Sequence, residues 1–489
     1  MKTFFSDHFD VAPKALERYG AFNVSLVTDL PLFIDPFLLF NSKKKRYRVL
    51  HDGIIQYLTF LRDKAADGNL TPALIDAWYR FPEVKQNWFG FSVTGNAGSG
   101  LGRDFARALH ENLHRLFPDF GGEAITKGSH LEKLCLINSG VGRDNISDFT
   151  TNLIKGFLCE YTQAFALKHL KAEYQRSIAI RKVRFNYDTE TWESLKYVLP
   201  WVNNDYVLLC PKDILTKDEN WINKDDLFSD FSDIPNAILD DELRGQINNY
   251  FAKVLVRDKR KEPTAKQLVE AARRTILEYP ALIDYYIKYK EEHGDEAENL
   301  SSAKVKFSEY LYIAQIKELQ AKLQKESTFY ETLGNTYDEA KHRLEYLRDV
   351  IENKGGHRMF YPNGQPLQKE ADLQIMYRLV WIGTTSDISR EVNDGRGPAD
   401  FKVSRGATDK TIVEFKLAKN TQLRRNLEKQ AAIYQRASDA KRSLKAILYF
   451  SALELRKVEK ILKTIGLYGN PDIVLIDARR DNKPSGSRG

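Results

Sequence analysis

A short β-branched, apolar run near the C-terminus carries two charged residues that a core strand ordinarily excludes. The run is Thr411–Leu417, and Glu414 and Lys416 stand two positions apart within it. Because side chains alternate between the two faces of a strand, we expect both charged groups on one face and the apolar residues on the other. Burying two charges is costly unless they serve each other or a metal. The run therefore predicts a functional site on a buried strand.

The residues around this run predict the order α-β-β-β-α-β. We expect a helix at 369–377, strands at 386–392, 399–403 and 411–417, a helix at 421–438, a strand at 445–450, a helix at 452–465 and a strand at 472–477. This order predicts a mixed sheet flanked by helices, with the charged residues on its central strands.

The whole chain, with 489 residues, is too long for one hydrophobic core. We expect a mixed α/β regulatory or sensor region at 1–215, a helical linker domain at 216–352 and the sheet domain at 353–489. Strands are expected at Phe22–Thr28, Leu134–Ile137 and Tyr206–Cys210, and helices at 47–61, 151–171, 307–324 and 337–352.

The composition is that of a cytoplasmic protein. No apolar run approaches the ~20 residues that cross a bilayer, and the first residues do not form a secretion signal. The three cysteines are scattered without metal or disulfide spacing. The net charge of +7 is compatible with a polyanionic partner but does not require one.

The charged residues suit hydrolysis of a phosphodiester. That reaction needs water brought to an anionic phosphorus and charge neutralised on the leaving oxygen, and a hard divalent cation held by carboxylates does both. Asp400 and Glu414 would be the ligands, and Lys416 could orient the water. Glu370, on the preceding helix, could accept a proton or complete a second metal site, and Glu391 competes for that role.

Three elements in order resemble the PD-(D/E)XK nuclease superfamily. They are Gly-Pro-Ala-Asp400, Glu414-x-Lys416 and, on the next predicted helix, Gln430-Ala-Ala-Ile-Tyr434, which is similar to the Gln-x-x-x-Tyr element of the RecB-like branch. The resemblance covers about 360–480 and implies a restriction-endonuclease-like domain. It also implies that Gln430 and Tyr434 help to position the metal site and DNA, with Mg²⁺ or Mn²⁺ as cofactor.

Cations follow the predicted site at the start of the next helix. Lys419, Arg424 and Arg425 could contact phosphates, which would make DNA affinity strongly dependent on salt. The alternative is an ordinary exposed helical face, because Glu428 lies close by.

The function expected from these features is metal-dependent endonucleolytic cleavage of DNA. A large extra portion joined to a compact nuclease is similar in layout to prokaryotic restriction and anti-phage defence effectors, in which the extra regions sense a trigger, restrain cleavage or assemble oligomers. The partners would be DNA and, by that layout, a second copy of the chain or another defence protein. Two alternatives stay open at the site: an inactive nuclease fold that binds nucleic acid or acts as a scaffold, and a solvated strand edge with ordinary charges.

Three other motifs compete for a function. His110-Glu-Asn-Leu-His114 has the H-E-x-x-H spacing of zinc proteases, but it lacks a third ligand and could be an exposed helical face. Gly95–Arg103 resembles a phosphate loop without its lysine, which favours a turn at a helix start. Gly140–Thr150 combines acids, an arginine and glycines. It predicts either a turn in which the Asp148 segment caps the following helix, or a ligand or effector site, including a partner surface that controls the nuclease.

Overall fold

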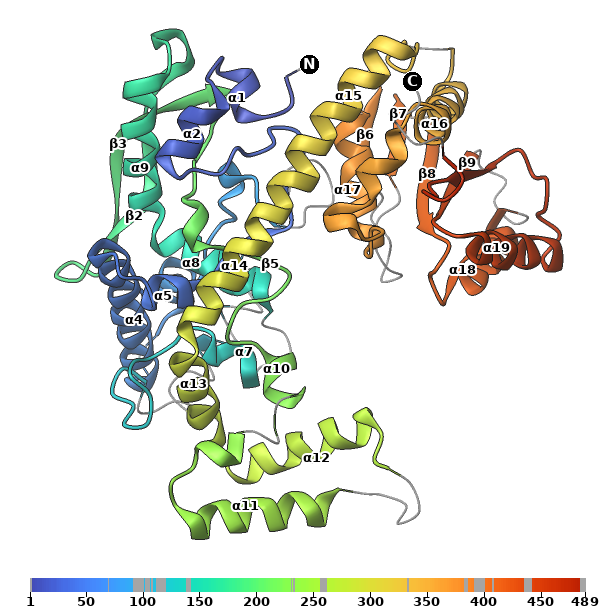
Figure 1. Cartoon of the computed structure of the whole chain (residues 1–489). Helices are drawn as coiled ribbons and strands as arrows, with labels where there is room; N and C mark the ends of the chain where they lie inside the picture. Colours follow the sequence, from blue (N-terminus) through green and yellow to red (C-terminus); the bar gives the residue numbers. More distant parts are fainter. Residues whose placement is uncertain are drawn as a thin grey trace.

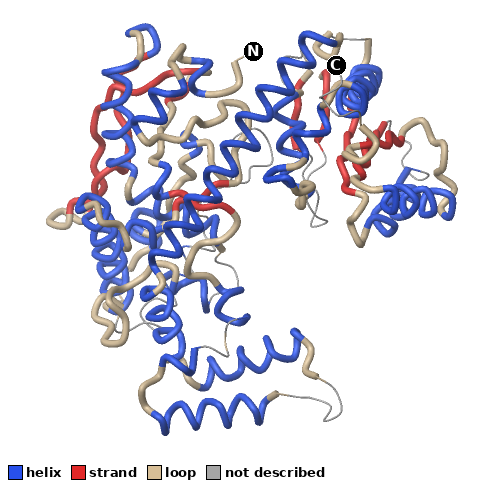
Figure 2. The backbone as a smooth tube through the Cα atoms, viewed as in Figure 1, coloured by secondary structure: helices blue, strands red, loops and turns tan. Residues whose placement is uncertain are grey.

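The structure of the chain is a computed structural model (Figure 1). It describes residues 2–68, 70–90, 101, 106, 109–110, 120–137, 142–229, 231, 234–255, 262–331, 334–381, 386–390, 401–406, 409–434 and 442–483, and at 237, 387–390, 401, 429–434 and 442 the backbone alone. Helices and several sheets are combined (Figure 2), so the fold is mixed α/β as expected. No helix within these ranges is long and apolar enough to cross a membrane.

The N-terminal part is built from helices around one long hairpin. Strands β2 (Gln175–Asn186) and β3 (Thr191–Val202) pair antiparallel, and β4 (Asp205–Tyr206) extends the sheet. Helix α9 (Lys155–His169) packs against this hairpin (Figure 1). The other elements are α1 (Phe5–His8), α2 (Pro13–Tyr19), β1 (Leu32–Ile34), α3 (Pro36–Phe40), α4 (Lys45–Ala66), α5 (Pro72–Trp78), η1 (Lys85–Asn87), α7 (Lys133–Ile137), α8 (Arg143–Leu153), η2 (Ala172–Tyr174), η3 (Lys212–Ile214) and β5 (Leu215–Lys217).

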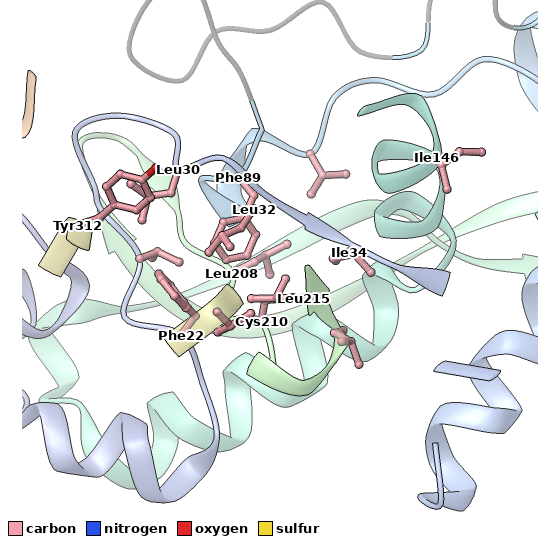
Figure 3. Close-up of a cluster of buried hydrophobic side chains, with 14 of the residues drawn as sticks. Phe22, Leu30, Leu32, Ile34, Phe89, Ile146, Leu208, Cys210, Leu215 and Tyr312 are labelled. Atoms are coloured by element: carbon pink, nitrogen blue, oxygen red, sulfur yellow. The ribbon is translucent and has the colours of Figure 1, made fainter. Parts of the chain in front are cut away.

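A buried cluster holds this part together and reaches into the middle of the chain. Figure 3 shows Phe22 and Leu32 near Leu208 and Cys210. Tyr312, from the middle region, lies next to Leu30 at the edge of the same cluster. These side chains are at most 1% exposed. Because β1 and β5 also pair antiparallel here, the beginning and the end of the N-terminal part share one core.

Three strands predicted in this part are wrong. The segment Phe22–Thr28 forms one isolated bridge, at Ser25, although Phe22, Val24 and Leu26 are buried. Residues Leu134–Ile137 belong to helix α7, and in Tyr206–Cys210 only the first residue is in a strand, β4. In each case the run of apolar residues reflects burial by neighbouring helices and loops, which a short apolar run cannot distinguish from a strand.

The middle of the chain is helical, as predicted. Helix α14 (Gly294–Glu309), the π-helical turn η5 (Tyr310–Ala314) and α15 (Gln315–Glu326) form one long rod in Figure 1. The remaining elements are α10 (Lys224–Ser229), η4 (Ile234–Ala237), α11 (Asp241–Val254), α12 (Ala265–Glu278) and α13 (Leu282–Glu292). Helices α11 and α12 form a hairpin at one end of the molecule (Figure 1).

The C-terminal part is a five-stranded mixed sheet between two layers of helices. The strand order is β10-β9-β8-β7-β6, with β6, β7 and β8 antiparallel and β8, β9 and β10 parallel. The elements are α16 (Thr336–Asn353), η6 (Gly356–Phe360), η7 (Pro362–Gly364), α17 (Glu370–Val380), β6 (Asp387–Arg390), β7 (Phe401–Arg405), β8 (Asp409–Leu417), α18 (Leu423–Tyr434), β9 (Arg442–Tyr449), α19 (Ala452–Thr464) and β10 (Ile473–Asp477). This order of helices and strands agrees with the prediction.

Each face of the sheet has its own apolar core. On one face α16 and α17 pack against β8, and Phe415 stacks on Tyr377 of α17 with ring centroids 3.8 Å apart. On the other face Ile447 packs with Leu427 of α18 and Leu462 of α19. Because both faces of β8 are covered over its last five residues, Val413–Leu417, a charged side chain there is buried whichever way it points.

A buried polar contact joins the C-terminal part to the rest. Lys217 of β5 donates to Asp372 of α17 at 2.9 Å, and the Tyr312 hydroxyl of η5 donates to the same carboxylate. All three residues are at most 5% exposed. Strand β5, the π-helical turn η5 of the long rod and helix α17 therefore meet at the Asp372 carboxylate.

Candidate functional site

Glu414 and Lys416 lie on the central strand of the sheet and share the face covered by α18 and α19. In the parallel register of β8 with β9, Glu414 pairs with Lys445 and Lys416 pairs with Ile447, a residue of the core on that face. Glu414 is 3% exposed and Lys416 8%. The neighbouring apolar side chains point to the opposite face, as the alternation of a strand requires.

Lys445 adds a second cation beside the carboxylate. Its ammonium lies 3.8 Å from the Glu414 carboxylate, and both side chains are about 95% buried. An ion pair in this environment is strongly attractive, because little water screens it, although both charges lose hydration. The sequence analysis missed this residue. The signal was present, since Lys445 also interrupts an apolar strand.

Glu370 is the first residue of α17 and contacts the end of β8. One of its carboxylate oxygens accepts hydrogen bonds from the Leu417 backbone N–H at 3.0 Å and from the Asn420 side-chain amide at 2.8 Å. This carboxylate therefore contacts the backbone of the residue that follows Lys416. It connects the helix before the sheet to the strand that carries the two charges.

The predicted DNA-binding cations follow the same strand. Lys419 donates to the side-chain carbonyl of Gln368, and burial lowers the pKa of Lys419 although Glu454 and Glu370 oppose this effect. Arg424 forms an exposed i,i+4 ion pair with Glu428 at 2.7 Å, and Arg425 is exposed. Exposed pairs of this kind add at most about 1 kcal/mol, so Arg424 could exchange its partner for a phosphate at little cost.

Four predicted site residues fall outside this description. Asp400 and Glu391 lie outside the described residues, and Gln430 and Tyr434 are described only as backbone within α18. The last described pair between β7 and β8 joins Phe401, the residue after Asp400, to Val413, the residue before Glu414. Within the described ranges, no three His, Cys, Asp or Glu side chains cluster as metal ligands.

The motifs that competed with this site are only partly described. The His110 ring makes an edge contact with Tyr79 at 5.5 Å, while Glu111–His114 lie outside the described residues. Of Gly95–Arg103 only Leu101 is described. The zinc site at His110 and His114 and the phosphate loop at Gly95–Arg103 therefore stay predictions from the sequence.

The segment after Gly140 differs from the expected cap. Helix α8 begins at Arg143, and the Gly142 N–H donates to the Asn145 side chain at 3.0 Å, so Asp148 lies inside the helix and does not cap it. Burial raises the pKa of Asp148 to about 7, with further contributions from Glu83 and Asp144. The prediction that Asp148 caps a following helix was wrong because the helix begins earlier.

Two protein-family models match parts of the chain. Residues 10–223 match a domain of unknown function (DUF8370), and residues 336–452 match a second one (DUF8371). The second match begins with α16, the helix that packs on the sheet, and includes β8 and β9. No curated protein and no solved structure matches the chain.

Proposed function

We propose that the C-terminal part is a metal-dependent nuclease that cleaves DNA phosphodiester bonds, in restriction or anti-phage defence. The observation that carries the proposal is the pair Glu414 and Lys416, buried on one face of the central strand. Support comes from the arrangement α17-β6-β7-β8-α18-β9, with three antiparallel strands followed by a parallel one. That arrangement is the one expected of a restriction-endonuclease-like αβββαβ domain.

The residues present fit a hard divalent cation. Glu414 and Asp400 would hold Mg²⁺ or Mn²⁺, with Glu370 as a further acid near the strand end, and a bound ion would supply charge neutralisation at the phosphate and a more acidic water. The proposal requires Asp400 to reach Glu414, by continuing the β7–β8 pairing one residue beyond Phe401. Lys416 would hold the phosphate charge, and Lys419, Arg424 and Arg425 would contact the DNA backbone.

Cleavage of supercoiled, linear and single-stranded DNA with Mg²⁺, Mn²⁺ or EDTA tests the reaction. We expect Glu414→Gln and Lys416→Met to abolish metal-dependent cleavage, while Glu345→Gln, at an exposed position of α16, leaves it unchanged. Binding of Mn²⁺ can be measured by the loss of the electron paramagnetic resonance signal of the free ion. This measurement does not require the nuclease to be activated. Cleavage that survives both site variants, or wild-type protein that binds no Mn²⁺, would refute the site.

A second candidate function is nucleic-acid binding by an inactive nuclease fold. The Lys445 ammonium 3.8 Å from the Glu414 carboxylate favours it, because a resident cation competes with a metal for the same oxygen atoms. This candidate predicts that wild-type protein binds DNA without Mn²⁺, and that Lys445→Gln gains Mn²⁺ binding. The nuclease proposal predicts Mn²⁺ binding already in the wild type.

A further inference from the structure

A cavity of about 420 Å³ lies in the N-terminal part, far along the chain from the candidate nuclease site. It opens between the segment before η1, the start of α9 and the middle of β2. The polar residues that line it are Glu83, Gln86, Lys155, Arg181, Lys182 and Tyr206. Its volume falls in the range of small-molecule sites, roughly 300–1,000 Å³.

Lys155 is the unusual member of this lining. It is 5% exposed, yet no residue in the described ranges forms a hydrogen bond or an ion pair with its ammonium. Buried lysines are almost always paired, because an unpaired ammonium loses its hydration without compensation. The same burial lowers the pKa of Lys155 to about 8. The ammonium is not among the fully enclosed polar atoms, so it faces the cavity, and a partner would reach it from there.

A β-bulge in β2 and a close approach of α9 to that bulge position Lys155 beside the cavity. The β2–β3 pairing shifts register between Ile180 and Arg184, and Lys182 within this bulge has a φ of 54°. A side chain at Gly156 would come within 2.7 Å of the Val183 carbonyl, so only glycine lets α9 approach the bulge this closely. Bulges of this kind redirect side chains and are common beside functional sites.

The charges of the lining indicate what the cavity accepts. Lys155, Arg181 and Lys182 oppose the single carboxylate of Glu83, which leaves a formal charge of +2. Lys182 also donates to the carbonyls of Ala77 and Arg80, which fixes its position. A phosphate monoester carries about two negative charges near neutral pH, so it matches this lining better than a carboxylate.

The apolar part of the lining provides room for the body of the same ligand. Val84, Ile180 and the Tyr206 ring form its walls. We propose that this cavity binds a small phosphate monoester with a flat or apolar body, of mononucleotide size, and that Lys155 donates to the phosphate. The site is independent of the nuclease proposal, and its test needs no cleavage.

The cavity adjoins the segment for which a ligand or effector role was one of two predictions. Asn152 of α8 donates to the Pro82 carbonyl at 3.0 Å, and Glu83 contributes to the raised pKa of Asp148. Helix α8 therefore connects that segment to the wall of the cavity. A ligand on Lys155 would contact the helix that begins two residues after α8 ends.

Isothermal titration of the full chain with adenosine 5′-monophosphate, inorganic phosphate and adenosine tests the proposal. We expect the monophosphate to bind more tightly than either fragment, and Lys155→Met to weaken it on the order of tenfold or more, the effect of one lost charged hydrogen bond. Lys168→Met, at an exposed position of the same helix, is the matched control. Equal affinity in Lys155→Met, or equal affinity for adenosine, would overturn the assignment.

Pyridoxal 5′-phosphate provides a second readout. Its aldehyde carbon condenses with a neutral amine to form an imine and water, and borohydride reduces the imine to a stable secondary amine. With the phosphate held by Arg181 and Lys182, which line the same cavity, we expect the neutral fraction of Lys155 to be labelled faster than Lys168. Inorganic phosphate should slow the labelling, as peptide mass spectrometry would show. Labelling of Lys168 with none at Lys155 would contradict a phosphate site next to Lys155.

Discussion

Replacing Lys155 by methionine should make the unliganded protein more stable. The pKa of Lys155 falls from 10.5 to about 8, mainly through burial. Each pKa unit corresponds to about 1.4 kcal/mol, so the charged ammonium destabilises the fold by roughly 3 kcal/mol below pH 8. Methionine keeps most of the length and flexibility of the stem without a charge. We therefore expect a gain of about 2–3 kcal/mol.

The gain should depend on pH in a defined direction. Below pH 8 the folded and unfolded states both bind the proton, so the full penalty is present. Between about 8 and 10.5 the unfolded state binds more protons than the folded state, so wild-type stability rises with pH and the gap to the variant closes. The neighbouring thiol of Cys159 stays neutral over this range, because burial raises its pKa to about 12.

Urea unfolding followed by tryptophan fluorescence measures this effect. Five of the six tryptophans precede residue 222, so the signal reports mainly the part that contains Lys155. The difference between Lys155→Met and wild type should be largest below pH 8, and Lys168→Met should show no such trend. A variant less stable than wild type, or a gap that does not change with pH, would show that the ammonium has a partner and would refute the reasoning.

Three further perturbations test the packing of the C-terminal part, each by chemical denaturation. Phe415→Ala should cost about 3–5 kcal/mol, since the ring is fully buried against α17. Asp372→Ala should cost about 3–5 kcal/mol because it leaves the buried Lys217 ammonium without its carboxylate, whereas a cost near zero would show that water replaces it. Burial acts to raise the pKa of Asp477, but hydrogen bonds from Arg479 outweigh it and lower the pKa to about 2. The stability difference between wild-type protein and Asp477→Asn should therefore fall by about 1 kcal/mol as pH falls from 3.8 to 2, because solvent screens part of this interaction.

The C-terminal sheet could be predicted because its signals are local. In Thr411–Leu417 the β-branched residues and the alternation of charged and apolar side chains identify a strand without any knowledge of its neighbours. Helix α18 and helix α19 follow turn residues that separate periodic segments. The order of the elements then limits the topology to a few sheets.

The N-terminal strands failed because the decisive contacts are distant in sequence. Phe22 is buried by Leu208 and Cys210, almost 190 residues away, and not by an adjacent strand. Loops that pack apolar residues in this way show the same local composition as a strand. The hairpin of β2 and β3 was missed for the opposite reason: its side chains are mostly exposed or half-buried, so it has no strong apolar alternation.

Four buried lysines show why the chemistry of a site needs the structure. Lys445, Lys133 and Lys155 each stand next to an apolar residue and Lys217 stands between Thr216 and Asp218, but these neighbours do not indicate which lysine is paired. The fold brings a carboxylate to Lys217, Lys445 and Lys133, at 2.9, 3.8 and 2.6 Å respectively. It brings a cavity to Lys155, and no described carboxylate forms an ion pair with its ammonium. A buried cation with a carboxylate partner is stabilised within the fold itself. An unpaired buried cation destabilises the fold, and a bound anion would reduce that cost. This difference places a second candidate site in the N-terminal part.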